Sequence, residues 1–226
     1  MPGTDPRADT GRPSIRRYRD GDRDSVYDVC LETAEAGQGA RGRYSTDDLV
    51  PDILVGPYLA LASRHAYVLD NGERAVGYIV GTANTDEFVS DYREHWMPRL
   101  RARYGPPPAV PVTAEDARQV AMFHPEYMLR PELAAHPAHL HVNLLTGYRG
   151  AGHGRALIQT FLRSVAAGGA ASCHLVVRDA NTAARAFYER LGWQPIQVHD
   201  PGSGIFLVMS TEHGLMKPAL IVTHSN

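Results

Sequence analysis

The chain has 226 residues, of which 43% are hydrophobic and 21% charged, a composition that suits a globular protein with a sizeable core and excludes a disordered chain. Its 23 basic and 25 acidic residues give a formal charge of -2 without a long run of one sign, so we expect no nucleic-acid partner. No apolar stretch approaches the ~20 residues that span a bilayer, and the polar N-terminus lacks a secretory apolar core, so a cytoplasmic protein without a membrane partner is expected.

The first elements along the chain are a leader, a strand and a helix. Residues 1–13 are polar and rich in Pro, Gly and Asp, and they are interpreted as a disordered leader. A short strand is predicted at 15–18. Val26, Val29 and Cys30 then recur at helical spacing, which predicts the first helix.

A second helical stretch and a hairpin follow. The helix is predicted over 45–63, where a Ser, Thr or Asp at 45–48 could cap it and acidic side chains favour its positive end. Strand-like runs at 66–69 and 75–81 flank Asn71-Gly72. Because Asn-Gly is among the strongest hairpin signals, these two runs are expected to pair antiparallel.

Residues 84–137 interrupt this rhythm. Helical pieces at 88–104 and 114–124 flank a proline-rich stretch at 106–111. Because the segment is short and interrupted by proline, it is interpreted as a helical insertion that packs beside the core rather than as a separate domain.

The C-terminal half alternates strands and helices around a glycine-rich loop. The two cysteines, Cys30 and Cys173, lie far apart inside apolar segments, which favours two buried thiols in a reducing compartment over the alternative of a disulfide. The predicted elements are a strand at 139–145, the loop, a helix bearing Leu157, Ile158, Phe161, Leu162 and Val165 on one face, a strand at 173–177, a helix at 181–191, strands at 196–199 and 205–209, and a tail at 212–226.

The loop is the run Tyr148-Arg149-Gly150-Ala151-Gly152-His153-Gly154-Arg155, placed between a strand and a helix. Glycines let successive amide N–H groups curl toward one point and allow a ligand to approach closely. The helix N-terminus adds a partial positive charge worth about 0.3–1 kcal/mol for a neighbouring anion. The pattern therefore predicts a site for a diphosphate.

Other kinds of glycine loop fit less well. A dinucleotide loop follows the first strand of a βαβ unit and has an acid about twenty residues later, whereas this loop comes late in the chain and has no such acid. An NTPase loop ends in Gly-Lys-Ser/Thr, whereas the chain has Gly154-Arg155-Ala156. A glycine-rich turn without a ligand is the remaining alternative.

The second motif lies on the predicted helix at 181–191. Asn181 can cap this helix, Ala184 and Phe187 share one face, and Gly192 suits a left-handed C-terminal cap. Tyr188 lies about two turns after Asn181 on the same side, where its phenol could donate a proton to a leaving thiolate. The alternative is that Tyr188 only packs on the sheet.

Together the two motifs resemble those of the GNAT acetyltransferase family. The resemblance rests on an Arg-x-x-Gly-x-Gly loop at 149–154 and on an Asn-x-x-Ala-x-x-Phe-Tyr helix that begins at Asn181 and is followed by Gly192-Trp193. The resemblance spans residues 14–211. It implies one α/β (α+β) domain, in which a mixed, mostly antiparallel twisted sheet of about seven strands is flanked by helices and carries the insertion at 84–137.

A narrower resemblance is to the histone-acetyltransferase-like domain at the C-terminus of animal O-GlcNAcases. It spans residues 25–145, and the insertion is similar as well. In the animal domains the glycine loop is degraded, whereas here it is intact, so the resemblance implies coenzyme binding and leaves catalysis open. The segments that carry it are 25–30, 67–70, 77–82, 96–98 and 123–126.

The resemblance implies acetyl-CoA as the cosubstrate. The backbone of Leu144 and Leu145 would pair with the pantetheine arm like an added strand, loop amides would hold the pyrophosphate, and Tyr188 would face the sulfur. The residues implied for coenzyme contact are Leu144, Leu145, Thr146, Arg149, Gly150, Ala151, Gly152, His153, Gly154, Arg155, Asn181, Ala184, Phe187 and Tyr188.

The base for the acceptor amine is less evident. Many GNAT enzymes carry a glutamate on the strand before the loop, but here that strand presents His139, His141 and Asn143 on one face. His141 is the candidate base, with a role-free packed histidine as the alternative, and Asn143 is placed to bond the acetyl group or the substrate. His136 with these histidines also suggests a metal, but no cysteine or carboxylate completes a ligand set, so no metal site is predicted.

Two functions follow. The first is direct acetyl transfer from acetyl-CoA to an amine of unknown identity, a small molecule or a protein lysine. The second is a non-catalytic acyl-CoA-binding module, a sensor or interaction domain. The protein is expected to be a monomer or a homodimer.

Overall fold

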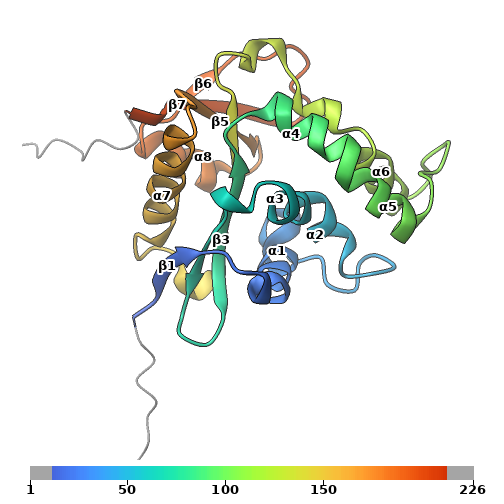
Figure 1. Cartoon of the computed structure of the whole chain (residues 1–226), viewed down its shortest axis with the longest axis horizontal. Coiled ribbons are helices and arrows are strands. Elements are labelled where there is room, and N and C mark those ends of the chain that lie inside the picture. The colour runs from blue at the N-terminus through green and yellow to red at the C-terminus, as the bar shows by residue number, and fades with distance from the viewer. Residues whose placement is uncertain (1–11, 213–226) are drawn as a thin grey trace, which may run out of the picture.

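A computed structural model describes residues 12–212, so the leader and the tail lie almost entirely outside the described residues. Seven strands form one sheet in the order β1-β2-β3-β4-β5-β7-β6 (Figure 1). This confirms the mixed, mostly antiparallel sheet that was expected. The strands are β1 (Ser14–Arg17), β2 (Tyr67–Asp70), β3 (Ala75–Thr82), β4 (Ala138–Leu144), β5 (Ser172–Arg178), β6 (Gln194–Ile196) and β7 (Gly204–Ser210).

The neighbouring strands β4 and β5 separate along their length. β4 pairs antiparallel with β3 along six residues, from His139 to Leu144. Its parallel pairing with β5 includes only Ala138 and His139. The rest of β4 therefore faces a space that we call the β4–β5 gap, bordered on β4 by residues 140–144.

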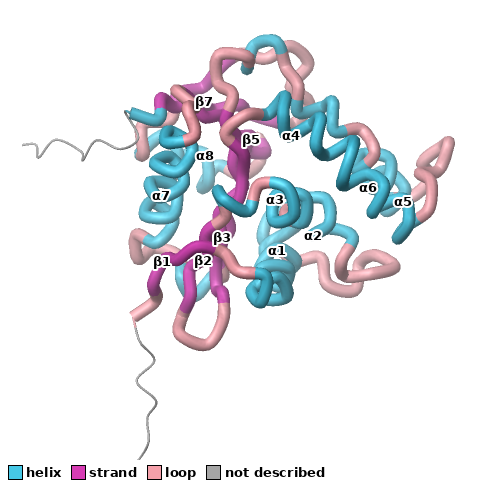
Figure 2. The backbone as a smooth tube through the Cα atoms, viewed as in Figure 1, coloured by secondary structure: helices cyan, strands magenta, loops and turns pink. Residues whose placement is uncertain are grey.

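Helices cover both faces of the sheet (Figure 2). On one face, α7 (His153–Ala167) and α8 (Thr182–Arg190) share an apolar cluster with the sheet. On the other face, α1 (Arg23–Gly37), α2 (Leu49–Leu54) and α3 (Gly56–Leu61) pack with the insertion in a second cluster. The sheet is thus the middle layer.

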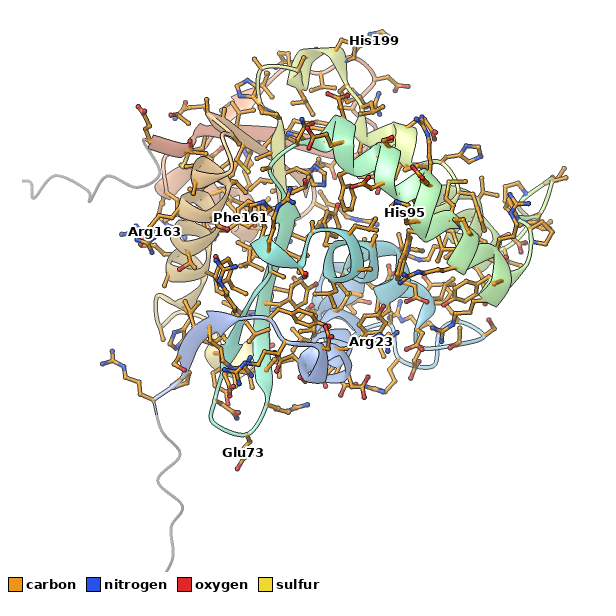
Figure 3. All side chains as sticks on the ribbon, in the orientation of Figure 1. Arg23, Glu73, His95, Phe161, Arg163 and His199 are labelled. Atoms are coloured by element: carbon orange, nitrogen blue, oxygen red, sulfur yellow. The ribbon has the colours of Figure 1, made fainter. Side chains whose placement is uncertain are left out.

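One glycine sets how closely α7 approaches the sheet. A Cβ atom at Gly81 of β3 would lie 2.6 Å from the Phe161 ring of α7 and 2.1 Å from the His139 carbonyl oxygen. Both distances are far below van der Waals contact, so only glycine allows this packing. Phe161 is fully buried between the helix and the strand (Figure 3).

The single helix predicted over 45–63 is wrong, because the chain forms two short helices instead. Asp48 precedes α2 but makes no side-chain cap bond, and Val55 has a non-helical φ of -129°. A Cβ atom at Gly56 would lie 2.5 Å from the Tyr27 hydroxyl oxygen, and Pro57 lacks the N–H that would continue the first helix. Tight packing against α1 and a proline therefore interrupt the helix.

The insertion is helical, as expected. It contains α4 (Thr85–Asp91), the π-helical turn η3 (Tyr92–Trp96), α5 (Met97–Tyr104) and α6 (Ala114–Met122), followed by the 3₁₀ turns η4 (Pro125–Met128) and η5 (Pro131–Leu133). Its helices lie beside α1–α3 in Figure 1. Its buried side chains, including Trp96 and Leu100, belong to the same cluster as those of α1.

A buried carboxylate ties the insertion to the core. The Asp52 side chain of α2 accepts hydrogen bonds from the Tyr27 hydroxyl of α1 at 2.6 Å and from the Tyr104 hydroxyl of α5 at 2.8 Å. Arg103 of α5 donates to the same carboxylate at 3.1 Å. Asp52 is 2% exposed, so these bonds supply the partners that a buried charge requires.

The smaller elements complete the chain. The hairpin is confirmed, since β2 and β3 pair antiparallel and Gly72 has a φ of +98°. The predicted strand at 196–199 lies instead at Gln194–Ile196, and the 3₁₀ turns η1 (Asp20–Asp22), η2 (Ser63–His65) and η6 (Thr146–Tyr148) were not predicted. Both cysteines are buried free thiols. Within residues 12–212, no helix has the length and apolarity to cross a membrane.

Candidate functional site

The glycine loop is an open turn that runs into α7. Gly150 and Gly152 have φ of +80° and +84°, the left-handed region that favours glycine. A Cβ atom on either would meet nothing within 4 Å, and both residues are exposed. The first α7 amide with an acceptor in the described chain is that of Ala156, which donates to Gly152. The N–H groups of residues 153–155 are therefore available to an anion.

Three elements meet at Gly154. A Cβ atom there would lie 3.3 Å from Cζ of Phe187 on α8 and 3.5 Å from Cδ1 of Leu144 on β4. The N-terminal turn of α7, the predicted second motif and the end of β4 are thus in contact. The two motifs that the sequence places about thirty residues apart lie side by side.

The β4 strand offers its backbone to the gap at alternate residues. The Leu145 N–H donates to the Val76 carbonyl on β3, and the Leu145 carbonyl accepts from the Tyr148 N–H. Because backbone groups alternate in direction along a strand, those of Val142 and Leu144 face the gap. Arg149 Nε already donates to the Leu144 carbonyl at 2.9 Å. Both backbone groups of Leu145 are engaged within the fold, which leaves the backbone groups of Val142 and the N–H of Leu144 for strand-like pairing with a ligand.

Caps at both ends of α8 fix the position of Tyr188 on the helix. The Asn181 side chain caps the N-terminus by accepting from the Ala184 N–H at 3.1 Å, as predicted. At the C-terminus, Gly192 has a φ of +95°, its N–H donates to Glu189, and the Trp193 N–H donates to the Tyr188 carbonyl. This pair of bonds is a Schellman cap, which confirms the predicted role of Gly192.

Tyr188 is buried between aromatic rings. Its ring centroid lies 5.2 Å from that of Phe187 and 5.8 Å from that of Trp193. Its hydroxyl makes no hydrogen bond to the described residues 12–212. Burial, and to a lesser degree the Cys173 thiol, raises the pKa of Tyr188 well above its usual value. The phenol therefore stays protonated across the neutral range and remains a hydrogen-bond donor.

On the opposite face of the sheet, the three polar residues of β4 share one side. His139 is buried, while His141 and Asn143 are half-buried. Tyr58 of α3 reaches both histidines, with its hydroxyl oxygen 2.7 Å from Nε2 of His139 and 3.3 Å from Nε2 of His141. Asn143 Nδ2 donates to the Tyr78 hydroxyl at 2.8 Å, and its Oδ1 accepts no hydrogen bond from residues 12–212.

The Pro137 carbonyl fixes the proton positions in the row of hydrogen bonds that joins Thr85, His139, Tyr58 and His141. The Thr85 hydroxyl donates to the Pro137 carbonyl at 2.7 Å, so its oxygen must accept from Nδ1–H of His139, also at 2.7 Å. Nε2 of neutral His139 then accepts from the Tyr58 hydroxyl. The Tyr58 oxygen in turn accepts from Nε2–H of His141, which leaves Nδ1 of His141 unprotonated and able to take a proton.

Burial favours the neutral form of both histidines. It lowers the pKa of His139 well below the usual value, with smaller contributions from His174 and His141. Burial, and then His174, lowers the pKa of His141 to about 4. Both imidazoles are therefore uncharged at neutral pH, as the tautomer assignment requires.

The remaining predicted residues are His136 and those around the loop. Nδ1 of His136 lies 2.6 Å from the Ser172 hydroxyl, and the His136 carbonyl accepts from Nδ1–H of His174 at 2.6 Å. Within residues 12–212, no three His, Cys, Asp or Glu side chains come close enough to hold a metal ion. Ala184 packs in the α7 cluster, His153 is half-buried, and the exposed residues of the predicted coenzyme set include Thr146, Arg149, Ala151 and Arg155.

Three polar residues of this site were missed in the sequence. Tyr58, Thr85 and Tyr78 come from α3, the insertion and β3, and each bonds to β4 across a long stretch of chain. Their spacing carries no motif. Only the pairing of β3 with β4 and the packing of the insertion bring them together.

Comparisons with known proteins indicate the family to which the chain is similar. Residues 114–195 match the family model described as an acetyltransferase (GNAT) domain. Protein O-GlcNAcase of Rattus norvegicus and that of Mus musculus are each 28% identical over 181 residues, which is 79% of this chain but 20% of those proteins. The chain thus spans about a fifth of the length of these relatives.

Solved structures extend the comparison. SsHAT is 44% identical with a TM-score of 0.85, over 89% of this chain and 99% of that one. PH1933 from Pyrococcus horikoshii OT3 is 14% identical with a TM-score of 0.57, over 88% and 98%. The yncA protein from Salmonella typhimurium, solved with its cofactor acetyl-CoA, is 12% identical with a TM-score of 0.51, over 92% and 96%. The last two show a likeness of fold alone.

Proposed function

Since this chain belongs to the GNAT superfamily, we propose that it binds acetyl-CoA and transfers the acetyl group to an amine. The observation that carries the proposal is the open glycine turn at the start of α7, in contact with α8 and the end of β4. The coenzyme would supply an activated acetyl thioester. The likeness of fold to a Salmonella protein solved with acetyl-CoA supports the same cosubstrate.

The chain offers matching groups for the pyrophosphate and for the pantetheine arm of the coenzyme. Unpartnered N–H groups at residues 153–155 and the exposed glycines suit a pyrophosphate, and the helix terminus adds a positive potential. Val142 and Leu144 present backbone groups to the gap, where a pantetheine arm could pair like a strand. Phe187 would border that arm, and Asn181 would contact it.

The reaction needs a donor at the sulfur and an acceptor at the amine. The amine nitrogen bonds to the thioester carbonyl carbon, the carbon–sulfur bond breaks, and the nitrogen loses a proton. Tyr188, which stays protonated, would donate to the sulfur as it becomes a thiolate. Nδ1 of His141 would take the amine proton, and Oδ1 of Asn143 would orient the amine N–H.

A coenzyme-binding module without transfer is the second candidate. Two observations favour it: the chain matches only about a fifth of two O-GlcNAcases, and the low pKa of His141 makes its imidazole a weak base. With so weak a base, acetyl transfer would require an amine that reaches the site already neutral.

Binding and transfer can be measured separately. Coenzyme A at a hundredfold excess over its Kd should add about 2.7 kcal/mol to the free energy of unfolding under either candidate. Release of free thiol from acetyl-CoA in the presence of an amine identifies the enzyme. We expect Tyr188→Phe to keep coenzyme binding and to slow thiol release about 10²–10⁴-fold. Unchanged release in this variant would exclude Tyr188 as the proton donor.

The wild-type measurements decide between the two candidate functions. An absence of stabilisation by coenzyme A would contradict both candidates. Stabilisation without thiol release, for amines of different charge, would favour the binding module.

A further inference from the structure

A hollow of about 270 Å³ lies beside His139 and its neighbours Thr85 and His174, and it has no role in the proposal above. Its wall includes Thr85 at the start of α4, Arg130 and Leu133 from the end of the insertion, and His174 of β5. His174 pairs with His139 across the sheet, so the side chains of both point to the same face. The hollow is therefore on the face of the sheet that presents His141 and Asn143.

Arg130 is the one wall residue with a fixed positive charge. Its Nε is buried without a hydrogen-bond partner. Its guanidinium also makes no ion pair with residues 12–212. Glu132, the nearby acid, accepts instead from the His199 N–H at 2.7 Å. The Arg130 side chain is otherwise half-buried and lines the hollow, so a ligand there could supply the ion-pair partner that residues 12–212 do not.

The walls define the chemistry of that ligand. The two terminal nitrogens of the guanidinium match a carboxylate through two parallel hydrogen bonds. The other walls include apolar groups of Leu129, Leu133 and Pro137, and Asp86 stands at the rim. A doubly charged phosphate would meet the Asp86 carboxylate and no second cation, so a singly charged carboxylate with an apolar stem fits better.

The distance to the candidate base limits the substrate class. His141 lies two residues beyond His139 along β4, which is about 7 Å. The ring centroids of His139 and His174 are 5.4 Å apart. A small molecule anchored at Arg130 would therefore need several bonds between its carboxylate and its amine for the amine to reach His141.

We infer that the Arg130 hollow binds the carboxylate of the acceptor, so that the acceptor is a small amine with a carboxylate several bonds away. This inference rests on the proposed acetyl transfer for the role of the amine. Carboxylate binding itself does not depend on it.

Binding is tested first, on the full chain with and without coenzyme A. The probes are pentanoate, 5-aminopentanoate and pentylamine. Their affinities are measured by isothermal titration calorimetry. We expect the two carboxylates to bind and pentylamine to bind at least tenfold more weakly. Arg130→Gln should weaken carboxylate binding roughly tenfold to a hundredfold. The control is Arg163→Gln, which changes an exposed arginine that points outward from α7 (Figure 3) and should leave binding unchanged.

Transfer is tested next by thiol release. We expect kcat/KM for 5-aminopentanoate to exceed that for pentylamine at least tenfold, and Arg130→Gln to remove this preference while coenzyme A binds as before. Retained coenzyme binding shows that the variant is folded. Equal carboxylate affinity in the wild type and Arg130→Gln, or no carboxylate binding at all, overturns the inference.

The two proposals can fail separately. If coenzyme A binds and pentylamine is acetylated as fast as 5-aminopentanoate, the acceptor assignment is wrong and the proposed function stands. If carboxylates bind through Arg130 but no amine releases thiol, acetyl transfer fails and with it the role of the hollow as an acceptor site.

Discussion

Tyr58 connects residues that the sequence keeps far apart. Its hydroxyl lies between two histidines that are 81 and 83 positions away in the chain, and its ring stacks on Phe88 of the insertion at 4.4 Å. It acts on His141 through hydrogen bonding, because it accepts the Nε2–H and so directs the free Nδ1. Tyr58 is thus a positioning residue for the candidate base.

Replacing this hydroxyl should affect stability and proton position together. Tyr58→Phe leaves Nε2 of buried His139 without a donor, so we expect a loss of about 1–3 kcal/mol in the free energy of unfolding, measured by chemical denaturation. Nitrogen-15 NMR should show His141 changing from a single Nε2–H tautomer to a mixture.

The matched control is Tyr67→Phe, which changes a buried tyrosine whose hydroxyl makes no hydrogen bond to residues 12–212. It should alter neither quantity. A His141 tautomer that is the same in Tyr58→Phe and the wild type would contradict the assignment.

Among single residues, the sequence could predict those that act through the backbone but not those whose role depends on tertiary contacts. Residues that act through the backbone, such as Gly150, Gly152 and Asn181, reveal themselves by type and spacing, because few residues can adopt those conformations or caps. Tyr58 and Arg130 depend on what the fold places beside them. Neither has a local pattern.

The helices α7 and α8 form one unit at the level of elements. The N-terminal turn of α7 touches Phe187, and the two caps of α8 fix where Tyr188 stands in its last turn. Because the Tyr188 carbonyl closes the Schellman cap, the end of the helix and the phenol are held by the same residue. The geometry of the pair depends on a close approach at Gly154.

A larger side chain at Gly154 should separate these elements. In Gly154→Val, the added methyl groups would overlap Phe187 and Leu144, since Cβ alone would already lie 3.3 Å and 3.5 Å from them. We expect the affinity for coenzyme A, measured by calorimetry, to fall tenfold or more.

Gly147→Val serves as the control, because a Cβ atom there meets nothing within 4 Å. It should bind coenzyme A within about threefold of the wild type, given the usual small effect of surface changes. Similar affinities in the two variants would show that the contact at Gly154 does not shape the site.

The elements themselves were largely predictable. Alternation, helical spacing and the Asn71-Gly72 turn located the hairpin, β4, α7 and α8, because each signal is local. The predicted helix over 45–63 failed because its interruption comes from tertiary packing of Gly56 against Tyr27. The separation of β4 from β5 likewise has no signature in the sequence of either strand.

For the whole molecule, buried histidines, three of them with strongly lowered pKa values, couple stability to pH. Burial lowers the pKa of His65 and of His141 to about 4 and that of His139 well below its usual value. In the unfolded chain a histidine has a pKa of about 6.5, so between about pH 6.5 and 4 the unfolded state binds more protons than the folded one. The free energy of unfolding should therefore decrease as the pH falls through this window.

Denaturation midpoints at pH 7.5, 6 and 5 measure this dependence. His65→Gln should reduce the slope, because it removes one group that the unfolded chain protonates. His95→Gln, at an exposed histidine of the insertion (Figure 3), should leave the slope unchanged. A midpoint that stays constant between pH 7.5 and 5 would contradict the neutral assignment.

The short pairing of β4 with β5 gives this protein an edge strand in the interior of its sheet. Beyond His139, the chain presents unpaired amides on a strand that has neighbours on both sides in the sheet order. Such groups normally occur at the rim of a sheet, where they attract further strands and lead to aggregation. Here, α7 lies against one face of β4 and α1 against the other, so we expect a narrow extended molecule, rather than a second protein strand, to complete the ladder.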